Sequence, residues 1–249
     1  MITRRELAMG APTALASAAL ALGGLGAVGI FDGLTPHGGR AAAQTFSVLE
    51  LEAKGPLDDV VMGSPTAPVT MIEYASMTCP HCAHFAVEIF PKLKEKYIDT
   101  GKVKYIMREY PLDGLAAAAF MLARCAGPDK YYPMIETLFA EQKKWAVKEP
   151  LPPLLAIAKQ AGFTEQSFKE CLADKAMLEK IQQVRNRGQQ KFKVEATPTF
   201  YVNGERFPGA LSMEDIDKAV APLVKNTEGV APKTDAPADG AKTDGAAKP

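Results

Sequence analysis

Cys79-Pro80-His81-Cys82 is the stretch of this sequence that decides both the fold and the chemistry. Before it lies Val69 to Ala75, a run of β-branched and apolar residues typical of a buried strand. After it, apolar residues recur every three to four positions from Ala83 towards Tyr97, which predicts a helix with a kink at Pro91. Val103 to Met107 then indicates a second strand. This order predicts a βαβ unit with parallel strands and with the two cysteines at the first turn of its helix.

The position of the two cysteines favours a redox pair. Their spacing brings the thiols within disulfide reach, with Cys79 facing solvent and the free backbone N–H groups at the helix start. Those donors and the helix dipole favour a thiolate at Cys79. Pro80 occupies the helix position that best tolerates proline, and a protonated His81 would add a positive charge beside the same sulfur. Cys79 and Cys82 are therefore the expected catalytic pair.

Two other interpretations of the pair are an inert disulfide and a zinc site. A zinc site needs two more ligands, but there is no second CxxC, and His81 and His84 are the only histidines after residue 43. We therefore expect neither a metal nor a cofactor.

Between about residues 110 and 194 the sequence changes to helical periodicity. Glycine and proline separate helix-like segments at 115–125, 132–145, 154–160, 167–172 and 177–190. We expect an all-helical block here.

The chain then returns to strand patterns. Thr199 to Val202 and Glu205 to Phe207 predict two strands joined by the hairpin signal Asn203-Gly204. Ser212 with Asp215 resembles a capping box at the start of a last helix, 213–224. The fold therefore closes with a ββα unit.

The first 43 residues predict an export signal. Arg4-Arg5 precede an uncharged stretch from Leu7 to Phe31, and Ala41 to Ala43 form a small-residue cleavage site. The two arginines favour the twin-arginine route, with ordinary secretion as the alternative. If it were uncleaved, the stretch is long enough to serve as a membrane anchor. We expect a periplasmic protein, with residues 44–68 as a lead-in segment.

The remaining composition adds two expectations. The 29 basic and 29 acidic residues balance, which argues against a nucleic-acid partner. Residues 226–249 lack periodicity and predict a disordered tail. In an oxidising compartment the even number of cysteines suggests pairing, so we expect a structural disulfide between Cys125 and Cys171, worth about 4 kcal/mol on the chain-entropy model.

Taken together, these residues resemble the DsbA family of periplasmic thiol:disulfide oxidoreductases. The resemblance rests on Cys79-Pro80-His81-Cys82 after a strand carrying Glu73, on Thr197-Pro198 before the hairpin, and on the helical block. It implies an α/β thioredoxin-like fold over residues 69–225, with βαβ and ββα units around a central mixed sheet and an all-helical insertion at about 110–194.

The resemblance also implies roles for single residues. Pro198 is expected to follow a cis peptide bond opposite the CxxC, so that the backbone of Thr197 can pair with an extended substrate. Glu73 stands where the family carries a buried acid, whose pKa burial would raise and which would relay a proton to or from Cys82. The alternative is an edge-strand glutamate that points to water. We also expect Met77 and Phe207 to form an apolar rim around Cys79.

The expected function is the introduction of disulfide bonds into reduced, extended substrate proteins. Reoxidation would require a membrane quinone-linked partner of the DsbB kind, and the protein is expected to be a monomer. Thr197 differs from the valine of the best-known DsbA oxidase and is closer to the residue of the related isomerases. A disulfide isomerase or reductase is therefore one alternative, and a non-enzymatic exported peptide-binding chaperone with a vestigial CxxC is another.

Overall fold

A five-stranded sheet organises the part of the chain that the computed structural model describes, residues 44–228. The predicted signal of residues 1–43 and most of the predicted tail lie outside these residues. The strand order is β1-β3-β2-β4-β5, with β1 at Val61–Met62, β2 at Val69–Ala75, β3 at Val103–Glu109, β4 at Thr199–Val202 and β5 at Glu205–Pro208. β2 and β3 are parallel, and the other neighbouring pairs are antiparallel.

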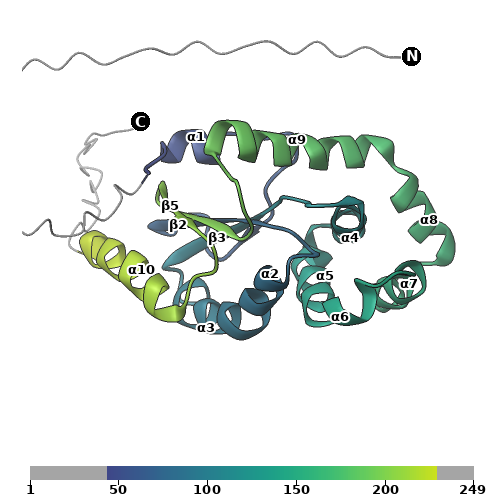
Figure 1. The fold of residues 1–249 in the computed structure, drawn as a ribbon. Helices are drawn as coiled ribbons and strands as arrows, with labels where there is room; N and C mark the ends of the chain where they lie inside the picture. The colour runs from purple at the N-terminus through teal and green to yellow at the C-terminus, as the bar shows by residue number, and fades with distance from the viewer. Residues whose placement is uncertain (1–43, 229–249) are drawn as a thin grey trace, which may run out of the picture. The chain divides into compact units, whose positions relative to one another are not determined.

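Helices cover both faces of this sheet. Figure 1 shows α1 (Val48–Glu52) and α9 (Lys175–Phe192) along one face, and α2 (Pro80–His84), α3 (Phe90–Leu93) and α10 (Met213–Glu228) along the other. All of β2 is buried between them, because successive side chains point to opposite faces. Met71 joins the larger apolar cluster, while Ile72 and Tyr74 join the smaller one.

The helix after the CxxC is irregular around Pro91, where the sequence predicts a kink. α2 continues into a π-helical turn, η1 (Phe85–Ile89), then into α3, and ends in a second π-helical turn, η2 (Lys94–Ile98). Pro91 lies in α3 and cannot donate the usual helical hydrogen bond, which accounts for the change of spacing around it.

The helical block is inserted between β3 and β4. It comprises α4 (Gly114–Cys125), α5 (Pro128–Ala140), α6 (Gln142–Trp145), α7 (Leu151–Gln160), α8 (Glu165–Ala173) and α9. The side chains of Asp113, Thr164 and Asp174 accept hydrogen bonds from the first turns of α4, α8 and α9, which fixes where these helices begin. The segment predicted as one helix at 132–145 is two helices, since α5 ends at Ala140.

The closing ββα unit has the predicted turn and cap. Asn203 and Gly204 have positive φ angles of 43° and 91°, as a tight hairpin turn requires. Ser212 and Asp215 form a reciprocal capping box: each backbone N–H donates to the other side chain, at 3.0 and 3.2 Å.

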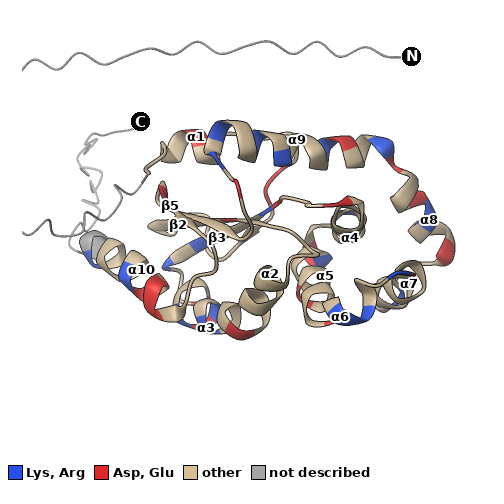
Figure 2. Cartoon of the chain, in the orientation of Figure 1, with Lys and Arg blue, Asp and Glu red and all other residues tan. Residues whose placement is uncertain are grey.

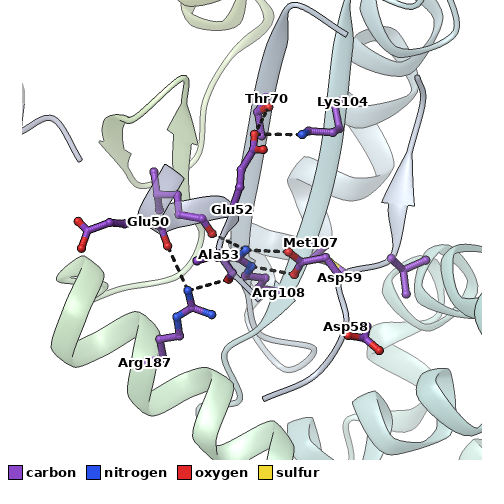
Figure 3. A network of polar contacts seen from close by, with 12 residues as sticks. Glu50, Glu52, Ala53, Asp58, Asp59, Thr70, Lys104, Met107, Arg108 and Arg187 are labelled. Atoms are coloured by element: carbon purple, nitrogen blue, oxygen red, sulfur yellow. Dashed lines mark hydrogen bonds and ion pairs between the residues drawn. The ribbon is translucent and has the colours of Figure 1, made fainter. Parts of the chain in front are cut away.

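The lead-in segment is an integral part of the fold (Figure 3). Arg108 of β3, whose side chain is only 5% exposed, donates to both carboxylate oxygens of Asp59 at 2.9 and 2.7 Å. Arg108 also donates to the Leu51 carbonyl at 2.6 Å. From α9, Arg187 donates to the carbonyls of Glu50 and Ala53 at 3.1 and 2.8 Å. These contacts fasten the lead-in to the sheet and to the insertion.

Charged residues of both signs lie along the helices, and in α9 the basic residues predominate, as Figure 2 shows. Of the helices described, none has the length and apolar character needed to cross a membrane.

Candidate active site

The two cysteines lie at the start of α2. Cys79 is its N-cap residue and Pro80 its first residue, as predicted. The sulfurs are not bonded to each other, so the structure shows the dithiol form. Cys79 is 6% exposed and Cys82 is fully buried, which leaves Cys79 as the sulfur that a substrate can reach.

The surroundings of Cys79 favour its thiolate. The pKa of Cys79 is lowered to about 5, chiefly by a hydrogen bond from the Cys82 thiol. Burial opposes this lowering, while contact with Thr197 and the backbone N–H groups of Cys82 and His81 add to it. The His81 side chain is exposed, and His81 acts on the sulfur through its backbone.

The loop before β4 lies opposite Cys79. The Thr197–Pro198 peptide bond is cis. The Cys79 thiol donates a hydrogen bond to the Thr197 carbonyl oxygen at 3.3 Å. The structure therefore brings together the two segments that the sequence analysis paired, although they lie more than a hundred residues apart.

Glu73 lies beneath this pair and is 2% exposed. The alternative of an edge-strand glutamate is wrong, because β2 lies between β3 and β4. Burial raises the pKa of Glu73 to about 8, the hydroxyl of Tyr105 opposes the rise by donating to the carboxylate, and the charge on Cys79 adds to it. The pKa of Cys82 is raised above its ordinary value by burial first, and also by Glu73.

Gln142 is a site residue that the sequence analysis missed. This buried side chain of α6 donates from Nε2 to the carbonyl oxygens of Met77 and Cys79, at 2.8 and 3.0 Å. The insertion thereby holds the backbone on both sides of Thr78. A lone glutamine in a helical segment carries no pattern that would indicate this contact.

Two further contacts complete the surroundings of the CxxC. The Thr78 hydroxyl donates to Asp113, the N-cap of α4, at 2.7 Å. Met77 is fully buried, so the expectation that it forms an exposed rim around Cys79 is wrong. Phe207 is partly exposed, and its part in such a rim stays a prediction.

The other two cysteines form a disulfide. Cys125 at the end of α4 is bonded to Cys171 of α8, with 6.2 Å between their Cα atoms. Within residues 44–228 no group of three or more His, Cys, Asp or Glu side chains is placed to hold a metal ion.

A CxxC dithiol at a helix start, opposite a cis-proline on this mixed sheet, defines a thioredoxin-like protein of the dithiol class. A family model described as thioredoxin matches residues 57–221. The structure of α-DsbA1 from Wolbachia pipientis is 32% identical, with a TM-score of 0.67, over 72% of this chain and 97% of that one. BdbD from Bacillus subtilis is 26% identical, with a TM-score of 0.61, over 67% of this chain and 93% of that one.

Among relatives known by sequence, a Rickettsia bellii protein described as a candidate protein-disulfide oxidoreductase is 35% identical over 168 residues. That match covers 66% of this chain and 65% of the relative, less than two thirds of its length. The chain belongs to the thioredoxin family, and within it to the DsbA-like thioredoxin-fold disulfide oxidoreductases. The fold class and the family resemblance predicted from the sequence are both confirmed.

Proposed function

We propose that this protein introduces disulfide bonds into exported substrate proteins by thiol–disulfide exchange through Cys79 and Cys82. The observation that carries the proposal is the position of Cys79 at the start of α2 and beside the Thr197 carbonyl, where its pKa is lowered to about 5. A stabilised thiolate is a good leaving group and favours the reduced form of the pair, which makes the disulfide form an oxidant. The name of the Bacillus subtilis relative, disulfide bond formation protein D, supports the same class of reaction.

The reaction starts from the Cys79–Cys82 disulfide. A substrate thiolate attacks the Cys79 sulfur, the bond between the two cysteines breaks, and Cys82 leaves and takes a proton from the Glu73 carboxylic acid. A second substrate thiolate then attacks the substrate sulfur bound to Cys79, and Cys79 leaves as a thiolate. Two electrons pass from the substrate to the enzyme, and the substrate gains one disulfide.

The remaining groups support these steps by position. The carbonyl of Thr197 lies 3.3 Å from the Cys79 sulfur, so an extended substrate could pair with this backbone while its sulfur reaches Cys79. The proposal includes reduced substrate proteins as partners, reoxidation by a membrane quinone-linked protein of the DsbB kind, and a monomer in the periplasm. The Cys125–Cys171 disulfide fits an oxidising compartment.

The reduction potential of Cys79–Cys82, measured against glutathione, tests the direction of the reaction. We expect a value closer to the ≈ −120 mV of DsbA than to the ≈ −270 mV of thioredoxin. A value near that of thioredoxin would overturn the oxidase and favour a reductase. Scrambled substrate disulfides test for isomerisation, which Thr197 leaves open.

A second experiment separates exchange from peptide binding. Replacing Cys79 with alanine should abolish the oxidation of a reduced substrate, because no sulfur can then accept the substrate thiolate. The chaperone would instead be supported if neither protein showed exchange activity and Cys79→Ala suppressed substrate aggregation as well as the unchanged protein does.

A further inference from the structure

Glu73 gives a proton to Cys82 when the disulfide opens, which leaves a carboxylate inside the protein. Burial raises the pKa of Glu73 to about 8 in the reduced protein, so at neutral pH Glu73 takes up a proton from water and must release it again before it can deprotonate Cys82. It nevertheless has almost no contact with solvent. Only 2% of the residue is exposed, and β2 is covered on both faces. A proton therefore needs a route through the protein.

A small cavity beneath the CxxC helix offers such a route. Its volume is about 20 Å³, and Glu73, Tyr105, Tyr132 and Glu136 are the polar residues that line it. A volume of roughly 10–15 Å³ suffices for one water molecule where polar partners are present. The Tyr105 hydroxyl donates to the Glu73 carboxylate, so this end of the cavity is already joined to the acid by a hydrogen bond.

The two tyrosines are held in place by the sheet. Tyr132 donates from its hydroxyl to the Val60 carbonyl at 2.7 Å and accepts from the Met107 N–H at 3.2 Å. Burial raises the pKa of Tyr105 and Tyr132 above the ordinary value, so both hydroxyls stay protonated at neutral pH. They can donate and accept hydrogen bonds without becoming charged.

Glu136 forms the other end of the cavity. It lies on α5, and its exposed side chain is in contact with bulk water while it also lines the cavity. Partial burial raises the pKa of Glu136, and Lys94 of η2 opposes the rise. A carboxylate at this place can take a proton from one side and release it on the other.

We propose that Glu73 exchanges its proton with solvent through this cavity, by way of Glu136. The inference rests on the proposed function of the Cys79–Cys82 pair. In the reoxidation direction the Glu73 acid first passes its proton through a water in the cavity to Glu136 and into solvent. The resulting carboxylate takes the proton of Cys82, and the Cys82 thiolate attacks the mixed disulfide at Cys79 and expels the partner's thiolate. Glu73 is then again the carboxylic acid from which the next cycle starts.

The charged and titratable groups around this route come from four elements. Cys79 and Cys82 face Glu73 from the CxxC turn, Tyr105 faces it from β3, and Tyr132 from α5. Lys94 acts on Glu136 from η2.

The test mixes the fully reduced protein with increasing oxidised glutathione and follows the fluorescence of Trp145, the single tryptophan. At saturation the observed rate is that of Cys82 attacking the Cys79–glutathione disulfide, the step in which the proton leaves. We expect Glu136→Gln to lower this limiting rate about fivefold, to shift its pH profile and to enlarge its solvent deuterium isotope effect. The second-order rate of mixed-disulfide formation at Cys79 should be unchanged.

Three variants make the result specific. Glu136→Asp should restore most of the rate, and Ala86→Leu, which fills the cavity from η1, should reproduce the defect. Glu88 is an exposed acid in η1, the same turn as Ala86, and it does not line the cavity. Glu88→Gln should therefore behave like the unchanged protein. Unaltered limiting rates and isotope effects in both Glu136→Gln and Ala86→Leu would overturn the route. Failure of the unchanged protein to form the mixed disulfide would instead overturn the proposed function.

Discussion

At the scale of single residues, the active site moves the pKa values of two neighbouring thiols in opposite directions. Cys79 stands at a helix start among donors, so its thiolate is stabilised. Cys82 is fully buried above a carboxyl group, so its thiol form is favoured. In the proposed reaction, one sulfur is thereby suited to leave, and the other keeps its proton until Glu73 removes it.

Replacing Glu73 with glutamine should stabilise the reduced protein in a pH-dependent way. The folded-state pKa of Glu73 is about 8, above the ordinary 4.5. Below pH 4.5 the carboxyl group is protonated in both the folded and the unfolded protein and costs no stability. As pH rises towards 8 it ionises more readily in the unfolded protein, so the free energy of unfolding falls. We expect Glu73→Gln to unfold at the same denaturant concentration as the unchanged protein near pH 4.5. At pH 8 it should be more stable by roughly 2–4 kcal/mol.

Chemical denaturation of the reduced proteins between pH 4.5 and 8.5 checks this difference. Glu88→Gln, at an exposed position, is the matched control for the loss of a carboxyl group. An offset for Glu73→Gln that does not vary with pH would contradict the prediction.

Gln142 should matter both for stability and for the thiolate. Gln142→Met keeps the size of the side chain but removes the hydrogen bonds to the Met77 and Cys79 carbonyls. We expect a loss of about 2 kcal/mol in the free energy of unfolding and a higher pKa for Cys79, measured by thiolate absorbance. The exposed Gln160→Met is the matched control and should stay within about 0.5 kcal/mol. A Cys79 pKa equal in both variants would limit Gln142 to a structural role.

The residues of the site differ in how far the sequence could predict them. Cys79 and Cys82 follow from their spacing at a predicted helix start, and the family resemblance paired Thr197-Pro198 with them. The contact of Gln142 depends on where the insertion meets the CxxC loop, which periodicity does not determine. Met77 was misplaced because an apolar residue beside a reactive cysteine suits a rim and a core equally well.

At the scale of elements, α9 lies unusually close to the sheet. A Cβ atom at Gly188 would lie 2.7 Å from the Tyr74 ring, and Arg108 holds that tyrosine by a 3.0 Å hydrogen bond to its hydroxyl. The absence of a side chain at Gly188 therefore allows the close approach, against the low helix propensity of glycine.

Gly188→Ala should destabilise the protein despite the better helix former. The gain in propensity is about 1 kcal/mol, whereas overpacking a filled interface costs about 1–3 kcal/mol. We expect a net loss of about 1 kcal/mol in thermal or chemical unfolding, because Tyr74 cannot move away easily. Gly114→Ala, where nothing lies within 4 Å, should be neutral or slightly stabilising. Equal stability of the two alanine variants would contradict the packing argument.

Most helices and strands were predictable because each has a local signal. The capping box at Ser212 and the Asn203-Gly204 turn depend on a few adjacent residues, and both appear in the structure. The sequence analysis treated residues 44–68 only as a lead-in, because the residues that hold this segment in place are distant in the sequence. Arg108 of β3 and Arg187 of α9 make these contacts.

At the scale of the whole molecule, two kinds of link hold the insertion together and to the sheet. The Cys125–Cys171 disulfide joins α4 to α8 within the insertion. Next to it in the chain, Arg124 donates to the buried Glu109 of β3 at 2.6 Å, which ties α4 to the sheet.

Replacing both Cys125 and Cys171 with serine should lower the free energy of unfolding by about 4 kcal/mol, because the bridge spans a sequence separation of 46 residues. Denaturation of the double variant measures this loss. Its Cys79 should titrate as in the unchanged protein, since no contact of Cys79 involves the bridge. A loss below about 1 kcal/mol would show that the unfolded chain is hardly restricted by the bridge.

The strands at the margins of the sheet bear on how the protein resists aggregation. An exposed margin offers unpaired backbone groups that recruit other chains into aggregates. Here β1 has only two residues, and the short β5 ends in proline. The N-terminal segment also covers β5, since Thr45 bridges to Glu205 and Phe46 donates to the Gly204 carbonyl at 2.8 Å. The fold thus protects both margins of the sheet from pairing with other chains, while the loop at Thr197 is where we propose that an extended substrate docks.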